Sequence, residues 1–144
     1  MKRLFFPFSL VLLFLVLAGC GKNIRLYGTV TFSDDDTPLP MGVVCFEQGN
    51  YSARGIIKPD GSYVVGSLSS NDGLLPGTYQ VHITGAFKEV GTGRDGMPLE
   101  ESLIDQKYLT PNTSGLVCEV PHPKGRYDIS VDRLPAPRRA PFKK

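Results

Sequence analysis

The sequence contains no tryptophan and only two histidines among its 144 residues. A transition-metal site needs three or four convergent ligands, most often from histidine and cysteine. Neither His82 nor His122 belongs to such a set of ligands in the sequence, so we expect both to be ordinary surface histidines. The sequence therefore predicts no metal site and no cofactor.

The chain also lacks the G-x-S-x-G motif, in which a serine nucleophile stands on a tight strand-to-helix turn. A serine or cysteine nucleophile needs a histidine or another base within hydrogen-bonding distance. No local combination of these residues indicates such a pair. We therefore expect a protein that is not an enzyme.

Basic and acidic residues are nearly equal in number. Basic residues number 16 and acidic residues 14, and two of the basic residues are Lys2 and Arg3 at the N-terminus. Residues 20–132 carry 9 basic and 14 acidic residues, a net charge of 9 − 14 = −5. A nucleic-acid-binding domain would carry a basic surface interleaved with aromatic side chains. Nucleic acid is therefore not an expected partner.

A long apolar run occurs once, from Leu4 to Leu17. It follows the basic pair Lys2-Arg3 and is shorter than the ~20 residues of a membrane-spanning helix, as is typical of a signal peptide. The run ends in Leu17-Ala18-Gly19-Cys20, which resembles the bacterial lipobox, where the cysteine becomes the lipidated first residue of the mature protein. The alternative is an ordinary signal peptide that is cleaved after Gly19.

Acyl chains on Cys20 would anchor the protein stably, because each buried CH2 contributes ~0.8 kcal/mol and more than one chain suffices for lasting attachment. Gly21 stands where lipoproteins retained at the inner membrane often carry aspartate. The resemblance therefore implies a cell-envelope protein that is anchored in the outer membrane and faces the periplasm.

Short segments in which apolar and polar residues alternate recur along the rest of the chain. The clearest is 78–84, where Tyr79, Val81 and Ile83 alternate with polar residues, and turn signals such as Pro59-Asp60-Gly61 separate the segments. Seven strands are predicted, at 24–32, 43–47, 52–58, 62–65, 78–84, 116–120 and 126–131. This pattern predicts an all-β, antiparallel β-sandwich.

The predicted organisation is one sandwich domain behind a signal peptide. Its parts are a signal peptide at 1–19, a lipidated anchor with a short linker at 20–23, the β-sandwich at 24–132 and a basic, proline-rich tail at 133–144. The mature chain would have 144 − 19 = 125 residues, which is a normal size for one domain with its own core.

The longest irregular stretch is 85–115. Within it, Pro98–Ile104 begins with proline followed by acidic residues, which favours one helical turn. A loop of this length either is functional or covers a sheet edge, and both interpretations remain open. The earlier run Asp34-Asp35-Asp36 lacks the alternating spacing and the closing glutamate of a calcium loop, so we expect a solvated turn there.

Cys45 and Cys118 each lie within a predicted strand, and two alternatives remain open for them. A disulfide between them would stabilise an exported protein by ~3–4 kcal/mol, because it would close a long loop. However, Val44 and Phe46 alternate inward, which turns Cys45 outward, whereas Cys118 lies on the apparent core face. Opposite facing prevents a bond, so two separate thiols, at least one of them buried, are favoured.

The C-terminal residues contain prolines at 135, 137 and 141, which disfavours helix and sheet and predicts an extended tail. Its last basic residues are Arg138, Arg139, Lys143 and Lys144. Near an anionic surface each would contribute ~1 kcal/mol. The tail is predicted either to contact lipid headgroups or an acidic wall polymer, or to be solvated without a partner.

Five motifs resemble small bacterial lipoproteins with a transthyretin-like, or carboxypeptidase-regulatory-like, domain. They are V-T-F (30–32), P-L-P (38–40), P-D-G-S-Y (59–63), G-L-L-P-G-T-Y-Q-V-H-I (73–83) and K-Y-L-T-P-N-T-S-G-L-V-C-E-V (107–120). The resemblance covers most of residues 26–132 and implies a prealbumin-type sandwich. Most members have no assigned activity. One enzymatic relative hydrolyses hydroxyisourate and carries a Y-R-G-S-type motif, whereas Gly125-Arg126-Tyr127 has the wrong order here.

We therefore expect a non-enzymatic, membrane-anchored cell-envelope lipoprotein that acts as a binding or structural module. Its expected partners are the membrane, through the lipid on Cys20, and a cell-wall polymer or an envelope protein. A first alternative is a carbohydrate- or protein-binding accessory domain that uses the 85–115 loop and exposed tyrosines. A second, disfavoured alternative is a small hydrolase of the transthyretin-related type, with His82 or His122 in a pocket.

Overall fold

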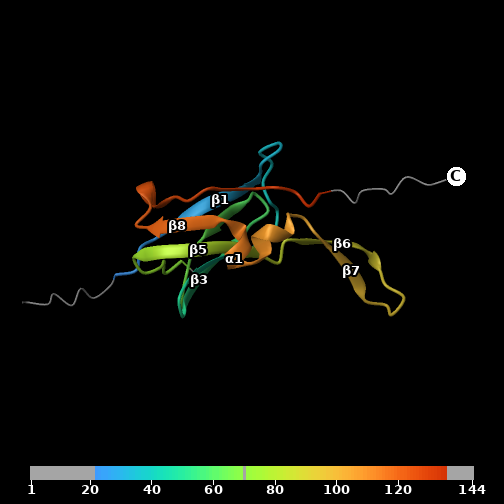
Figure 1. Ribbon diagram of the computed structural model, residues 1–144, viewed down its shortest axis with the longest axis horizontal. Helices are drawn as coiled ribbons and strands as arrows, with labels where there is room; N and C mark the ends of the chain where they lie inside the picture. The colour runs from blue at the N-terminus through green and yellow to red at the C-terminus, as the bar shows by residue number, and fades with distance from the viewer. Residues whose placement is uncertain (1–21, 70, 136–144) are drawn as a thin grey trace, which may run out of the picture.

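Two β-sheets share one hydrophobic core in the computed structural model, which describes residues 22–69 and 71–135 (Figure 1). The strands are β1 (Tyr27–Phe32), β2 (Gly42–Gln48), β3 (Tyr51–Ile57), β4 (Ser62–Val64), β5 (Gly77–Thr84), β6 (Phe87–Thr92), β7 (Pro98–Ser102), β8 (Leu116–Val120) and β9 (Ile129–Val131). One sheet has the order β3-β2-β5-β8 and the other the order β4-β1-β9. The predicted all-β sandwich is confirmed.

The alternation of apolar and polar residues accounts for the strands of the sandwich. In β5, Tyr79, Val81 and Ile83 are fully buried, and they are the residues that the period of two places on the core face. The same pattern in β1 buries Val30 and Phe32. All seven predicted strands are present with small shifts at their ends, as β1 to β5, β8 and β9.

The core is built around aromatic side chains from both sheets. Phe46 of β2 is fully buried, and its ring lies 6.3 to 6.4 Å from the rings of Tyr63, Tyr79 and Tyr127. Buried aliphatic side chains surround them, and the buried cluster runs from Leu26 to Val131. The described residues therefore contain a hydrophobic core.

The sheets are not antiparallel throughout. β1 pairs with β9 in parallel, with Val30 opposite Ile129 and Phe32 opposite Val131, whereas all other strand pairs are antiparallel. Parallel neighbours need a long connection, and here almost the whole chain lies between the two strands. The first strand of the chain is therefore the central strand of the smaller sheet, and the last strand is one of its edges.

Gly28 allows the closest approach within this sheet. A Cβ atom at this position would lie 1.9 Å from the carbonyl oxygen of Tyr127 and 2.9 Å from the hydroxyl of Tyr63. The Tyr63 hydroxyl donates a hydrogen bond to that same carbonyl. Only glycine leaves room for this contact.

The expectation for 85–115 was partly wrong. Pro98–Ser102 is strand β7 and makes no helical turn, because its backbone pairs with β6. Helical turns form later, in η1 (Gln106–Leu109) and α1 (Pro111–Ser114). Asp105 caps η1 by accepting from the Lys107 amide, and Gly115 ends α1 in the left-handed conformation. Pairing within the β6–β7 hairpin thus overrides the local helix signal at Pro98.

The sandwich has two distinct ends. The leader end consists of residues 22–25, 66–69, 71–77 and 120–126, where Ile24 forms a bridge with Leu74 and the Arg25 carbonyl lies beside Gly125. The β6–β7 hairpin projects from the other side of the molecule along its long axis (Figure 1). Within residues 22–69 and 71–135, no helix is long and apolar enough to cross a membrane.

Candidate functional site

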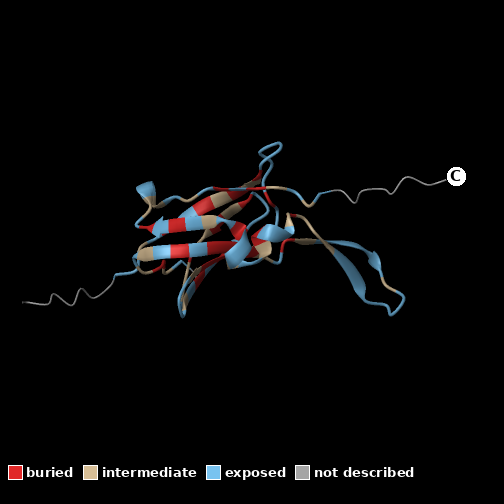
Figure 2. Ribbon diagram, in the orientation of Figure 1, coloured by how far each residue is buried: buried red, intermediate tan, exposed pale blue. Residues whose placement is uncertain are grey.

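The β6–β7 hairpin, here called the arm (residues 87–102), projects from the sandwich (Figures 1 and 2). From Lys88 to Glu100 every residue is exposed except the half-buried Gly93. By contrast, four of the eight residues of β5 are buried in the body of the protein. The arm therefore contributes almost nothing to the core, and its surface is available for other contacts.

The base of the arm is held firmly. Ala86 and Ile104, which flank it, are both fully buried. The Leu103 amide donates to the Ala86 carbonyl at 2.8 Å, and the Ser102 hydroxyl donates to the Ile104 carbonyl at 2.8 Å. These contacts fix the direction in which the arm leaves the sandwich.

The tip of the arm is a compact turn. The Gly93 amide donates to the Met97 carbonyl at 2.7 Å, and Asp95 accepts from the Met97 amide at 3.2 Å. Gly96 has a φ of 80°, in the left-handed region. The Asp95-Gly96 pair is a strong hairpin signal, and it was the one feature of the sequence that could have revealed the arm.

Three apolar side chains are exposed on the arm. They are Val90 (53 % exposed), Met97 (65 %) and Leu99 (51 %). The strand register shifts between Glu89 and Gly91, so Val90 lies in the bulge. Exposed apolar residues are ordinary when they are scattered, but these three gather on one 16-residue hairpin that has no core of its own.

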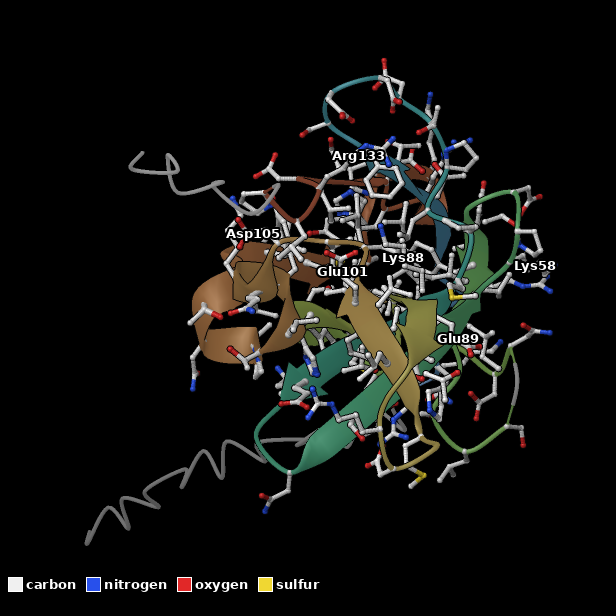
Figure 3. All side chains as sticks on the ribbon, turned by 90° about the vertical axis from the view of Figure 1, so that its right-hand side faces the viewer. Lys58, Lys88, Glu89, Glu101, Asp105 and Arg133 are labelled. Atoms are coloured by element: carbon white, nitrogen blue, oxygen red, sulfur yellow. The ribbon has the colours of Figure 1, made fainter. Side chains whose placement is uncertain are left out.

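The two strands of the arm carry one ion pair and one pair of opposed like charges. Lys88 and Glu101 form an ion pair with 2.9 Å between Nζ and Oε2, and both are labelled in Figure 3 together with Glu89. Glu89 stands directly opposite Glu100 in the strand register. Like charges in directly opposite positions destabilise a strand pair. A basic side chain from outside would relieve this repulsion.

The outer edges of β6 and β7 pair with no other strand among the described residues. Unpaired edges present free backbone N–H and C=O groups that can accept another strand. A two-stranded hairpin alone is marginally stable in water. The arm thus has the features of a surface that is completed by a partner.

The predicted lipidation and tail sites lie outside the described residues. These are Cys20 and the basic residues Arg138, Arg139, Lys143 and Lys144. Arg133, the first residue of the predicted tail, is described and is bound to the sandwich. Its guanidinium donates to Asp34 at 2.9 Å and to Asp35 at 2.8 Å, and it lies 3.6 Å above the ring of Phe32.

The run Asp34-Asp35-Asp36 is an exposed turn, as expected, and two of its carboxylates bind Arg133. Hydrogen bonds from Thr37 and then the charge of Arg133 lower the pKa of Asp35 to about 2. The guanidinium of Arg133 therefore neutralises part of the negative charge of this turn. Among residues 22–69 and 71–135 there is no group of three or more side chains that could hold a metal ion.

Cys45 and Cys118 are both free and both buried. Cys45 stands opposite His82 in the strand register, whereas Cys118 stands opposite Tyr79 on the other face of β5. Their side chains therefore point to opposite faces of the sheet, which is incompatible with the disulfide alternative. Burial raises the pKa of the Cys45 thiol, and burial raises that of Cys118 to about 11, so neither favours the reactive thiolate.

The prediction of a surface position was wrong for His82, which is only 7 % exposed. It does lie on the polar face of β5, but η1 and α1 pack against this strand, and the Ser114 hydroxyl donates to the Val81 carbonyl. His82 Nε2 lies 3.9 Å from a Glu47 carboxylate oxygen, and Nδ1 has no hydrogen-bond partner among the described residues.

His122 is half-buried, with its ring 5.2 Å from the ring of Tyr127. Neither histidine lines either of the two surface pockets described for the chain. The tyrosines form no exposed platform: of the six, only Tyr27 is exposed, at 43 %, and the others are buried or half-buried.

No protein-family model, no curated protein and no solved structure matches the chain. The functional evidence therefore consists of the sequence and of the geometry of the described residues. Within that geometry, the arm is the feature that the sandwich itself does not need.

Proposed function

We propose that the protein is a non-enzymatic, lipid-anchored component of the cell envelope that binds a protein partner through its arm. The observation that carries the proposal is the arm itself: a hairpin with a fixed base, two free edges and three exposed apolar side chains. The lipobox-like sequence that ends at Cys20 supports the membrane anchor, and Gly21 after it supports the outer membrane and the periplasm as the location.

The position of the arm suits display. Cys20 comes two residues before Lys22, where the described chain begins at the leader end, and the arm projects from the opposite side of the molecule (Figure 1). The six residues of β6 would extend about 20 Å at ~3.3 Å per residue. An anchor at Cys20 would therefore hold the sandwich at the membrane and present the arm away from it.

The chemistry of the arm defines the kind of partner. A free strand edge is suited to β-strand addition, in which backbone hydrogen bonds supply affinity and alternate side chains supply specificity. Val90 and Leu99 would contact apolar side chains of the added strand. The opposed pair Glu89 and Glu100 would favour lysine or arginine on the partner. The partner is thus an envelope protein with an extended, basic and apolar segment.

Several observations support a binding role over a catalytic one. The interior of the sandwich is filled by large side chains, among them Phe46, Tyr63 and Tyr79. Both described cysteines have raised thiol pKa values. Residues 22–69 and 71–135 show no cluster of exposed tyrosines, on which the carbohydrate-binding alternative would rely.

The test is site-specific photo-crosslinking in intact cells of the native host. A photoreactive amino acid at Val90 should crosslink to one discrete envelope protein, because Val90 lies in the exposed bulge of the arm. The matched control is the same amino acid at Val117, an exposed valine of β8 (56 %) in the sandwich. Position 117 should not give this product.

A second variant tests the expected charge of the partner. Reversing both opposed glutamates, in E89K/E100K, should abolish the crosslink from position 90, because two new cations would repel a basic segment. The proposal would be contradicted by an identical product from positions 90 and 117, by no product from position 90, or by a crosslink that charge reversal leaves unchanged.

A further inference from the structure

The charged residues of the sandwich are separated between its ends. The leader end carries four basic residues, Lys22, Arg25, Lys124 and Arg126, and one acidic residue, Asp72. A second carboxylate, that of Asp128, lies just beyond these bounds and pairs with Arg126. The Asp72 carboxylate accepts hydrogen bonds from the backbone amides of Ser67, Leu68 and Ser69, so it is already satisfied by the loop that it organises. The net charge of this end is positive although the sandwich as a whole is acidic.

Two of these cations flank a surface pocket of about 390 Å³ on the outer face of the β4-β1-β9 sheet. Arg25 and Arg126 come from neighbouring segments, because Tyr27 forms a parallel bridge with Arg126. The floor of the pocket includes the Tyr27 ring and Val64. A volume of this size is at the lower end of the range for small-molecule sites.

Both guanidinium groups have free donors among the described residues. Asp128 accepts from Nε of Arg126 at 2.7 Å, which leaves the two terminal nitrogens of Arg126 without a described acceptor. Arg25 forms no ion pair with any described carboxylate. Guanidinium groups bind phosphate oxygens through paired N–H donors. The pocket therefore offers a phosphate group donors from two sides.

An apolar side chain stands at the same end. Leu68 is 95 % exposed, more than any other large hydrophobic residue of the described chain, and it lies in the loop that Asp72 holds. That loop packs closely against the beginning of the described chain, because a Cβ atom at Gly73 would collide with the Ile24 carbonyl. A basic surface with a protruding leucine is the combination by which peripheral proteins contact an anionic bilayer.

Chain length keeps this surface near the membrane. Arg25 is five residues after Cys20, and five residues span at most about 18 Å even when fully extended. The acyl anchor would thus hold the pocket close to the headgroups, and the high local lipid concentration would compensate for weak intrinsic affinity.

We infer that the leader end is a membrane-binding face, in which Arg25 and Arg126 bind the phosphate of an anionic phospholipid headgroup and Leu68 enters the interfacial region. Its orientation rests on the proposed anchoring at Cys20. The face fixes the sandwich on the bilayer, so that the arm points away from the surface instead of swinging on a flexible tether.

The test is flotation of the unlipidated chain 21–135 with phosphatidylglycerol vesicles at low salt. This form retains the whole described core and lacks both Cys20 and the last four basic residues of the tail. It should bind phosphatidylglycerol vesicles and not phosphatidylcholine vesicles. The double variant R25Q/R126Q should bind roughly 30-fold more weakly, about fivefold for each cation. Leu68→Ser should weaken binding by a smaller factor.

The matched controls remove the same groups elsewhere. K88Q/R94Q removes two cations from the arm, and Val90→Ser removes an apolar side chain of the arm that is 53 % exposed. Both should bind like the parent. Equal loss of binding in K88Q/R94Q would reduce the effect to net charge and would overturn the inference, as would unchanged binding by R25Q/R126Q.

A third arm of the experiment separates the lipid from free phosphate. If inorganic phosphate or glycerol phosphate perturbs the NMR signals of Arg25 and Arg126 while vesicles do not bind, the pocket takes a soluble anion and the membrane assignment is wrong. Failure here leaves the crosslink from Val90 unaffected, because the arm lies on the other side of the molecule (Figure 1).

Discussion

The sandwich and the arm are both made of paired strands, but different forces hold them together. In the sandwich, β5 lies between β2 and β8 and buries Tyr79, Val81 and Ile83 against the opposite sheet. In the arm, β6 and β7 have only each other, and their side chains are almost all exposed (Figure 2). Hydrophobic burial specifies the first, whereas turn geometry and backbone hydrogen bonds specify the second.

This difference indicates how a small protein can carry a binding surface at little cost to its stability. The core lies entirely in the sandwich, so the sequence of the arm is free to suit a partner. Substitutions should therefore have large effects on global unfolding in the sandwich and small ones in the arm.

The largest expected effect is in the aromatic core. Phe46→Ala should reduce the free energy of unfolding by about 3–5 kcal/mol, because it leaves a cavity among Tyr63, Tyr79 and Tyr127. Leu99→Ala in the arm should change it by less than about 0.5 kcal/mol. Urea denaturation of residues 21–135 measures both. Comparable losses would show that the arm is part of the cooperative core.

A smaller effect is expected where η1 and α1 cover β5. The buried Ser114 hydroxyl donates to the Val81 carbonyl and accepts from the Leu116 amide at 3.2 Å. Ser114→Ala should cost about 1–2 kcal/mol, because it leaves buried backbone groups unpaired. Ser130→Ala, at an exposed position of β9, is the control and should be nearly neutral. A neutral Ser114→Ala would mean that the covering segment detaches readily.

The loss of stability at low pH should depend on Asp132, a residue of the sandwich. The ion pair with Lys107, followed by hydrogen bonds from Ser33 and Tyr108, lowers the pKa of Asp132 from 3.8 to about 2. Because the folded-state pKa is depressed, this contribution is present above about pH 4 and is lost as the pH falls toward 2.

Asp132→Asn should therefore reduce the fall in stability between pH 4 and pH 2, as measured by urea midpoints across that range. Lys107→Gln should reduce it partly, since the ion pair at 2.6 Å is then absent. The size of the effect is limited because Asp132 is 46 % exposed and solvent screens the pair. If the urea midpoint of Asp132→Asn fell between pH 4 and pH 2 as steeply as that of the parent protein, this role of Asp132 would be contradicted.

The smallest effect is expected within the arm. Glu100→Lys places a cation opposite Glu89 and replaces repulsion by attraction, a gain of about 0.2–1 kcal/mol for the strand pair. Amide hydrogen exchange in β6 and β7 should slow by a small factor, while the global unfolding free energy stays unchanged. Slower exchange in β5 as well would show that the arm and the sandwich open together.

Sequence reasoning succeeded where burial enforces alternation. Each of the seven predicted strands buries a face, so its apolar period is visible in the sequence. The strands of the arm were missed because Lys88-Glu89-Val90-Gly91-Thr92 has no apolar period, since no core selects one. The helix signal at Pro98–Ile104 was misleading because it rests on that segment alone, whereas β7 forms by pairing with the preceding strand β6 across the Asp95-Gly96 turn.

The candidate sites show the same division. Opposite facing of Cys45 and Cys118 could be predicted, because it follows from the period of two along each strand. The burial of His82 could not, because it depends on η1 and α1 folding back onto the polar face of β5. The pocket between Arg25 and Arg126 joins residues about 100 positions apart, and no local pattern connects them.

The sequence by itself determined the sandwich class and the strand faces, because short-range periodicity and turn chemistry encode both. The tertiary structure decided which charges gather at the leader end, which strands remain unpaired and where the arm points. These properties depend on how distant segments pair across the sheets, and that pairing is set by the burial of one shared core.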